Sequence, residues 1–331
     1  MKKTRYILIL VLLLAGCGPR ENAADQLNQA PVTSVSIPEF NADSAYAYVE
    51  KQVMFGPRVP GSDAHTACAA WLAATLEKFA DTLIIQEFKA RAYNNSTLRG
   101  KNFIASFKPE NSKRVLLCAH WDSRPYADHD PDNVNHKTPI DGANDGASGV
   151  GVLIELARQF SLQKPGIGVD IILFDLEDYG PPQDAQKYEG TDYWGLGSQY
   201  WSNTPHKMNY RARFGILLDM VGVKDATFLK EGYSLMYAPS KVKKVWDMAD
   251  AMGYSDYFAD RNGGYITDDH YYINKIANIP TVNIIHLDNN SPNGSFFSHW
   301  HTVSDNMDYV DKATLQVVGR VVMSVVYLEK I

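Results

Sequence analysis

The chain has 331 residues, of which 45% are hydrophobic, 21% charged and 11% aromatic, and its formal net charge is −6. This balance is too apolar for a disordered chain and too polar for a protein that crosses a membrane many times. Nucleic-acid binding is not expected, because phosphate contacts need clustered Lys and Arg and the sequence has no basic tract. Three cysteines are too few for a disulfide scaffold or a cysteine-rich zinc site.

The first 16 residues have the features of a bacterial lipoprotein signal peptide. Lys2, Lys3 and Arg5 precede a short apolar run over residues 6–14, well below the roughly 20 residues of a membrane-spanning helix. Cleavage before Cys17 would leave this cysteine to carry lipid. We therefore expect a lipid-anchored protein of the bacterial cell envelope, periplasmic or facing the outer membrane, whose only membrane contact is the anchor.

The rest of the chain divides into a tether and one domain. Residues 17–38, which include the lipidated cysteine, are rich in Asn, Gln, Ala, Ser and Pro and show no apolar periodicity, which predicts a flexible tether. We see no further linker, so residues 39–331 are predicted to form a single catalytic α/β domain. Cys68 and Cys118 remain; an exported protein permits a bridge between them, and two separate buried thiols are the alternative.

Helical and strand patterns alternate along this domain. A helix capped by Asp43–Ser44 is predicted to run to about residue 54, and a second one covers residues 63–79. The remaining predictions are strands at 83–88, 102–107, 115–118, 170–174, 214–218 and 281–285, and helices at 148–160, 195–202, 242–252, 270–276 and 312–327. Several strands are continuously apolar, as expected when helices cover both faces of a sheet. The predicted fold is a three-layer α/β sandwich with a central mixed, mostly parallel sheet.

Acidic and imidazole side chains follow several of these strands at the point where the strand ends. In open α/β sheets, ligands bind beyond the carboxyl ends of the strands, so such side chains are expected to converge on one rim. A Gly-rich loop before the helix at 148 and a short segment before the last helix add two more candidates. In chain order, the candidates are His120, Asp145, Glu177, Asp178, Asp219 and His301.

This set of side chains suits a catalytic zinc site. Imidazoles and carboxylates are suitable ligands for Zn²⁺, and a carboxylate outside the metal shell can act as general acid and base. Glu177 and Asp178 fit this division, because neighbouring side chains point in different directions and only one readily binds the same ion. The sequence contains no Gly-x-Ser-x-Gly, His-Glu-x-x-His or Walker motif.

The order of these residues resembles the co-catalytic zinc aminopeptidase family and, within it, the glutaminyl-peptide cyclotransferases, or glutaminyl cyclases. The resemblance spans most of residues 56–305, in the family's order. The segments that carry it are 58–62, 120–123, 182–184, 217–222, 268–270 and 300–302. Any one of these segments is unspecific, and the series is what points to the family.

The resemblance implies one zinc ion held by Asp145, Asp178 and His301, with Glu177 as the acid/base. The family more often has two consecutive glutamates where this chain has Glu177 and Asp178. Aspartate still binds zinc, but its shorter side chain requires a shift of the backbone.

The resemblance also assigns expectations to residues around the metal. It implies a hydrogen-bonded carboxylate pair of Asp219 and Asp268, and it places Trp300 in the wall of the substrate pocket. His120 matches the residue that would hold a second metal in the aminopeptidases. Residues 128–138 look like an insertion whose role the sequence does not reveal.

The implied reaction is cyclisation of the N-terminal glutamine of peptides or proteins to pyroglutamate, with release of ammonia. The first alternative is a zinc aminopeptidase that binds two metals, through His120 and Asp219 as well, and releases N-terminal amino acids. A different zinc amidohydrolase is a further alternative. A non-catalytic peptide-binding lipoprotein is the last, and it predicts missing ligands, whereas every candidate position here holds a competent residue.

Overall fold

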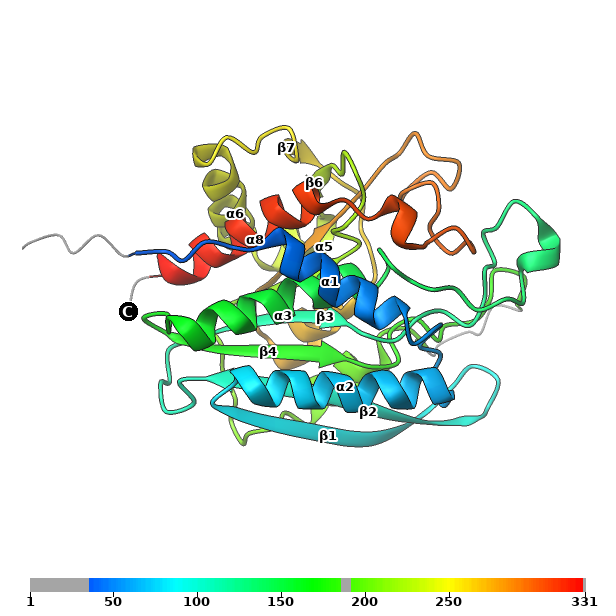
Figure 1. Ribbon diagram of the computed structural model, residues 1–331, viewed down its shortest axis with the longest axis horizontal. Coiled ribbons are helices and arrows are strands. Elements are labelled where there is room, and N and C mark those ends of the chain that lie inside the picture. The colour runs from blue at the N-terminus through cyan, green and yellow to red at the C-terminus, as the bar shows by residue number, and fades with distance from the viewer. Residues whose placement is uncertain (1–35, 186–191, 330–331) are drawn as a thin grey trace, which may run out of the picture. The chain divides into compact units, whose positions relative to one another are not determined.

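The computed structural model describes residues 36–185 and 192–329 (Figure 1). The predicted signal peptide, Cys17 and residues 17–35 of the predicted tether lie outside the described residues. The described residues from Ile37 onward belong to one compact unit. Within the described ranges, no helix is both long and apolar enough to cross a membrane.

A six-stranded mixed sheet runs through this unit, in the order β1-β2-β4-β3-β5-β8. Its strands are β1 Thr82–Arg91, β2 Thr97–Phe107, β3 Arg114–His120, β4 Gly168–Phe174, β5 Gly215–Asp219 and β8 Thr281–Ile285. The β1–β2 and β2–β4 pairs are antiparallel, and the other three pairs are parallel. The strands β3, β4, β5 and β8 are buried along their whole length, which explains why their sequences are mostly apolar. All six strands match predicted ones.

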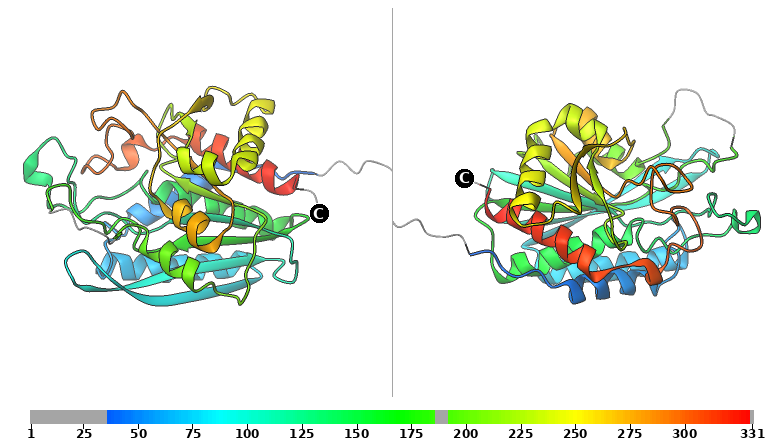
Figure 2. Two further views of the ribbon diagram at one scale, coloured as in Figure 1. Left: turned by 180° about the vertical axis from the view of Figure 1, so that it is seen from behind. Right: turned by 90° about the horizontal axis from the view of Figure 1, so that it is seen from above.

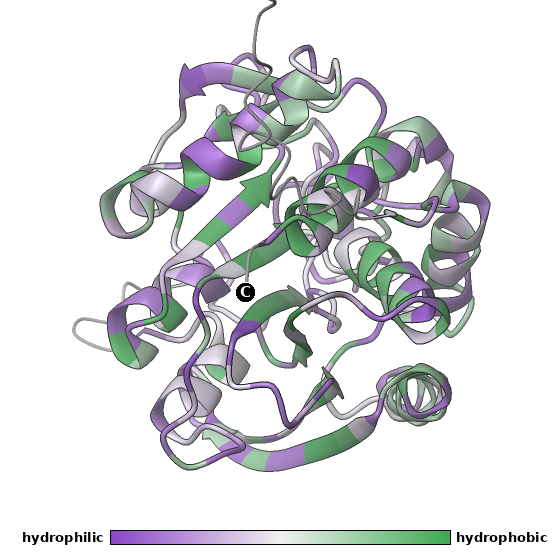
Figure 3. Ribbon diagram, turned by 90° about the vertical axis from the view of Figure 1, so that its left-hand side faces the viewer, coloured by the Kyte–Doolittle hydropathy of each residue, from purple (hydrophilic) through white to green (hydrophobic). Residues whose placement is uncertain are grey.

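Helices cover both faces of the sheet, so the predicted three-layer sandwich is confirmed. One face carries α2 Asp63–Phe79 and α3 Ala147–Leu162, with α1 Ala42–Val53 and α8 Lys312–Tyr327 packed against α3 (Figure 1). Behind the sheet lie α4 Leu196–Asn203 and α7 Asp269–Tyr272, which continues as a π-helix over Ile273–Ala277 (Figure 2). Leu117 and Cys118, neighbours in β3, belong to apolar clusters on opposite faces, as strand geometry requires. Hydrophobic residues accordingly concentrate along the strands and the inner sides of the helices (Figure 3).

A smaller layer lies beside β8 and was not predicted from the sequence. It consists of β6 Phe228–Lys230, β7 Phe258–Asn262, α5 Gly232–Tyr237 and α6 Pro239–Ala251. Only α6 matches a predicted helix, at 242–252. The two strands are three and five residues long and pair with an irregular register, so they have no alternating apolar pattern that could reveal them.

One local prediction is wrong, and one question that the sequence left open is decided by the structure. The first helix is capped by Asn41, not by Asp43 or Ser44, because the Asn41 side chain accepts the backbone N–H of Ser44 at 2.9 Å. Cys68 and Cys118 are both buried and free, so there is no bridge between them. Burial raises the pKa of the Cys68 thiol to about 12, which makes it chemically inert at neutral pH.

The start of α3 lies close against the end of β5. A Cβ atom at Gly149 would lie 2.2 Å from the carbonyl oxygen of Leu218, so a residue with a side chain would force the helix away from the strand. The N-cap residue Gly146 has a φ of 92°, in the left-handed region that favours glycine. These two glycines allow the loop that contains Asp145 to reach the end of β5, where Asp219 lies.

Candidate active site

Three predicted metal ligands from distant parts of the chain meet beyond the carboxyl ends of the parallel strands. Asp178 follows β4, Asp145 precedes α3, and His301 lies between β8 and α8. His301 Nε2 is 3.5 Å from Asp145 Oδ2 and 3.3 Å from Asp178 Oδ1. One ligand atom from each residue lies within 4.8 Å of the other two, and all three residues are buried. The structure therefore brings these three predicted residues together.

The chemistry of this group fits a zinc ion. Two carboxylates and one imidazole are donors that Zn²⁺ accepts in catalytic sites, where a fourth position stays open to substrate. Asp178 Oδ2 is buried and has no hydrogen-bond partner, which is unusual for a polar atom in a folded protein. Burial raises the pKa of Asp178 despite the opposing charge of His301. A divalent cation would satisfy this oxygen and balance the buried carboxylates.

A second group that suits a cation shares Asp145 with the first. His120 Nε2 lies 3.0 Å from Asp145 Oδ1 and 3.3 Å from Asp219 Oδ1, and all three residues are buried. Asp145 thus turns one carboxylate oxygen toward His120 and the other toward His301. This arrangement fits the predicted role of His120 as a ligand of a second metal ion. It equally fits a protonated His120 that interacts directly with the carboxylates of Asp145 and Asp219.

The turn after β4 places Asp178 among the possible metal ligands and Glu177 outside them. Leu176 has a φ of 60°, a left-handed conformation that costs energy for a residue with a side chain and is typical of functional sites. The buried Asp122 carboxylate accepts the backbone N–H groups of Glu177 at 3.1 Å and of Asp178 at 3.2 Å, and so holds this turn. Glu177 lines the same pocket as Asp178 but is not part of either metal-binding group. Burial, and then the charges of Asp178 and Asp268, raise the pKa of Glu177 well above its ordinary value.

Asp219 and Asp268 lie in the same pocket, and the hydrogen bond expected between them stays a prediction. The Asp268 carboxylate also accepts the backbone N–H of Asp269 and the Asn283 side-chain amide, the latter at 2.6 Å. Burial and the neighbouring charge of Asp268 raise the pKa of Asp219 to about 7. The two carboxylates interact through charge, and the Asp268 carboxylate is held in place by its own helix and by β8.

The pocket above these residues is small and has aromatic walls. Its volume is about 280 Å³, and it contains the predicted Trp300 together with Phe296 and Tyr265. The Trp300 ring lies against the His301 ring, with centroids 3.7 Å apart and planes at 22°. The Phe296 ring packs beside the Trp300 ring, with centroids 4.6 Å apart. An apolar wall of this kind offers a contact surface to a ligand bound beside Asp145, Asp178 and His301.

Sequence reasoning missed three residues that shape this site. Trp194 lines the pocket, with its ring nearly parallel to His301 at a centroid distance of 6.4 Å. Arg124 lies 4.9 Å from the Trp194 ring, forms a two-pronged ion pair with Asp128 at 2.7 and 2.6 Å, and approaches Asp178 Oδ1 at 3.4 Å. Asp128 is the first residue of the predicted insertion. Through its ion pair with Arg124, the insertion helps to place a positive charge beside Asp178. Neither Trp194 nor Arg124 follows a predicted strand directly, and no local pattern marks them.

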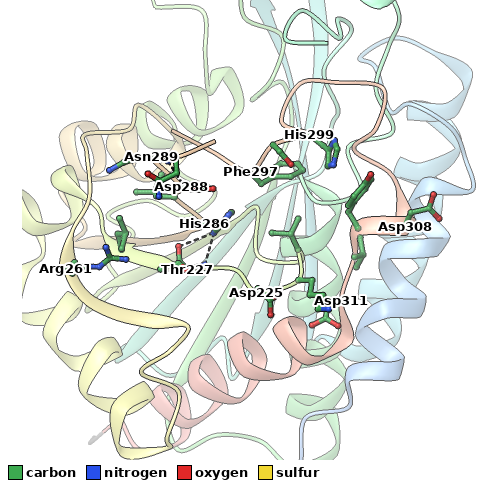
Figure 4. A pocket seen from close by; sticks show the side chains of 18 residues that line it. Asp225, Thr227, Arg261, His286, Asp288, Asn289, Phe297, His299, Asp308 and Asp311 are labelled. Atoms are coloured by element: carbon green, nitrogen blue, oxygen red, sulfur yellow. Dashed lines mark hydrogen bonds between the residues drawn. The ribbon is translucent and has the colours of Figure 1, made fainter. Parts of the chain in front are cut away.

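A larger hollow, of about 650 Å³, is lined in part by Phe297 and His299, which lie in the sequence between Phe296 and Trp300 of the smaller pocket (Figure 4). His286 is its most buried polar side chain, and its Nδ1 accepts the backbone N–H of Thr227 at 2.8 Å. Asp225, Asp288 and other surface carboxylates surround it. None of the predicted site residues lines this hollow, so the smaller pocket, where ligand candidates and a free carboxylate converge, is the candidate active site.

This chain is similar to known zinc-dependent peptidases and glutaminyl cyclases. The family model of peptidase family M28 matches residues 102–326. The structure of a Zn-dependent exopeptidase from Parabacteroides distasonis is 53% identical, with a TM-score of 0.87, and the match covers 89% of this chain and 100% of that one. The structure of Bacteroides thetaiotaomicron glutaminyl cyclase bound to N-acetylhistamine is 52% identical, with a TM-score of 0.87 and coverage of 89% and 100%.

Two curated relatives differ in how much of their length is matched. Aminopeptidase YwaD of Bacillus subtilis is 27% identical over 251 residues, which cover 72% of this chain and 46% of that protein. The match thus spans less than half of the aminopeptidase. Glutaminyl-peptide cyclotransferase of Bos taurus is 24% identical over 353 residues, which cover 95% of this chain and 92% of that protein. The similarity to the bovine protein therefore extends over nearly the whole of both chains.

Proposed function

This chain belongs to peptidase family M28, and we propose that it is a zinc-dependent glutaminyl cyclase. Its substrates are peptides or proteins with N-terminal glutamine, and its products are pyroglutamyl peptides and ammonia. The observation that carries the proposal is the position of Glu177. This carboxylate lines the same small pocket as Asp145, Asp178 and His301 but stands outside their group, as a proton carrier must. The similarity to the B. thetaiotaomicron cyclase over the whole of that chain supports it.

Asp145, Asp178 and His301 would hold one zinc ion. A bound zinc ion supplies Lewis acidity toward the side-chain carboxamide oxygen of the substrate glutamine. We propose that the site holds a single zinc ion. His120 is then protonated, donates a hydrogen bond to Asp145 and does not bind the zinc. The carboxylate contacts raise the pKa of His120 well above its ordinary value although burial opposes this, which suits the donor role.

The chemical steps need no nucleophile from the protein and no water. The substrate's own α-amine attacks its side-chain carbonyl carbon, so that a C–N bond closes a five-membered ring and the bond to the carboxamide nitrogen breaks. Glu177 accepts a proton from the amine and returns it to the departing nitrogen, which leaves as ammonia. Trp194, Trp300 and Phe296 restrict the first residue to the conformation in which amine and carbonyl carbon are close.

The aminopeptidase alternative rests on the second group of residues. His120 and Asp219 are placed so that, together with Asp145, they can hold a second ion, and a two-metal site activates water for peptide hydrolysis. The product distinguishes the two activities. A Gln-initiated peptide incubated with the zinc-loaded protein should lose one ammonia and keep all its residues, as measured by mass spectrometry. Appearance of free glutamine and a shortened peptide would contradict the cyclase proposal.

We also propose that the protein is anchored to the cell envelope through lipid on Cys17, with residues 1–16 removed. The support is the order of charged, apolar and cysteine residues at the start of the chain. A Cys17→Ser variant should move from the membrane fraction to the soluble fraction of the envelope, and it should fail to incorporate an alkyne-labelled fatty acid. Labelling of the serine variant at the wild-type level would refute the anchor.

A further inference from the structure

The catalytic pocket is too small to hold more than the beginning of a peptide. Its volume of about 280 Å³ lies below the roughly 300–1,000 Å³ of pockets that enclose whole drug-sized ligands. If the proposed function holds, the first residue of the substrate fills this pocket. The second residue must then lie at the mouth, against whichever side chains are exposed there.

Tyr265 is the large side chain most exposed at this mouth. It lines the pocket, yet 62% of it remains accessible, whereas Phe296 and Trp300 are partly buried against the apolar core. It lies three residues before Asp268, on the segment that also contributes Ile266 to the pocket. An aromatic ring with a free face at the entrance of a substrate pocket offers a contact surface that the first residue alone does not use.

The structure holds the Tyr265 ring in place from below. Gly232 lies directly beneath it, since a Cβ atom there would come within 2.7 Å of the ring. Tyr233 meets the same ring edge to face, with centroids 5.0 Å apart and planes at 70°. The Tyr265 side chain is therefore supported on one side by the start of α5 and open on the other.

The backbone around Tyr265 is anchored as well. Gly263 N–H donates to the Lys230 carbonyl at 2.7 Å, and Gly232 N–H donates to the Gly264 carbonyl at 2.8 Å. On the far side, Ile266 N–H donates to the buried Glu231 carboxylate at 3.0 Å. A side chain on so well-tied a segment loses little conformational freedom when a ligand packs on it, which favours binding.

We propose that Tyr265 forms a binding subsite for an aromatic or large apolar side chain at the second position of the substrate. The subsite rests on the proposed cyclase function and adds a substrate class to it: peptides that begin with Gln followed by an aromatic residue. Tyr237 provides a matched control, because it belongs to the same group of stacked tyrosines, is 38% exposed and does not line the pocket.

The test compares ammonia release from Gln-Phe-Ala-amide and Gln-Gly-Ala-amide by the zinc-loaded protein. We expect wild-type kcat/KM to be about three- to tenfold higher for the phenylalanine peptide, the size of one aromatic contact. In Tyr265→Ala this ratio should fall to near one, mainly through a higher KM for the phenylalanine peptide. Tyr265→Phe, which keeps the ring, and Tyr237→Ala should retain the wild-type ratio.

The outcomes separate the subsite from the function. A wild-type ratio near one, or a ratio unchanged in Tyr265→Ala, refutes the subsite while the cyclase assignment stands. Equal loss of the ratio in Tyr237→Ala also refutes it, because the effect would then belong to the tyrosine group and not to the pocket mouth. If the wild-type protein cyclises neither peptide, the proposed function fails and the subsite with it.

Discussion

Replacing Glu177 with glutamine removes the proposed proton carrier and keeps the size of the side chain. The surrounding structure predicts that the fold tolerates this change. The backbone N–H of Glu177, and not its side chain, is held by Asp122. Burial and the charges of Asp178 and Asp268 raise the pKa of Glu177, so a neutral amide relieves repulsion. We expect a melting temperature equal to or above that of the wild type.

The expected loss of activity follows from what the other pocket carboxylates do. Asp145 and Asp178 belong to the metal group, Asp219 lies against His120, and Asp268 is hydrogen-bonded by Asn283 and by the backbone N–H of the next residue. None of them is free to take over the proton transfer. The loss should therefore reach the upper part of the range for general acid–base catalysis, about 10³- to 10⁴-fold in kcat. This corresponds to about 4–5.5 kcal/mol of transition-state stabilisation.

Three measurements decide this prediction. Ammonia release from a Gln-initiated peptide gives kcat, elemental analysis gives bound zinc, and thermal melting reports the fold. Glu177→Gln should bind zinc as the wild type does, whereas the matched variant Asp178→Asn should lose both zinc and activity. A Glu177→Gln variant that keeps kcat within tenfold of the wild type, with zinc bound, would refute the role of Glu177.

Two further predictions concern the fold that carries the site. Gly149→Ala should destabilise the protein by about 1–3 kcal/mol in urea unfolding, because the new methyl group overlaps a carbonyl oxygen of β5. The control Gly264→Ala places its methyl group in open space and should leave the stability unchanged. Equal urea midpoints for the two variants would contradict the close contact between α3 and β5. Breaking the buried ion pair with Arg114→Met should cost about 3–5 kcal/mol at neutral pH, because it leaves the buried Asp170 carboxylate without a counter-charge. Burial alone would raise the pKa of Asp170, but the Arg114 hydrogen bonds outweigh it and lower the pKa. The stability from this pair is therefore complete above the ordinary aspartate pKa of about 4 and is lost as the pH falls toward the folded value. The difference between wild type and variant should narrow below about pH 4; a constant difference would refute this reading.

The buried strands could be predicted because their signal is local. β8 was predicted with the bounds that it has, and β4 differs only at its first two residues. A strand covered on both faces is apolar at most positions, and this requirement can be read without knowing its neighbours. The bounds of α2 and α8 were likewise predicted as found, since each combines an N-cap side chain with helical apolar spacing.

The short elements beside β8 could not be predicted for the opposite reason. β6 and β7 gain their strand geometry from each other and from packing on β8, not from their own composition. The cap of α1 shows the same limit at a finer scale. Asn41, Asp43 and Ser44 are all competent N-cap residues, and only the backbone conformation of Asn41, with a φ of −106° and a ψ of 104°, selects the one that acts.

For this protein, the sequence by itself determined which chemical groups stand at the ends of the strands. Strand ends can be read from short apolar runs, and the side chains that follow them include the acids and imidazoles that zinc chemistry needs. Only the tertiary structure decided which group faces which. His301 lies more than a hundred residues from Asp178, and their 3.3 Å approach depends on strand order and on the left-handed turns at Leu176 and His301. Those turns arise from contacts between distant segments, and so does the hydrogen bond that Asn283 donates to Asp268. No local sequence pattern encodes such contacts.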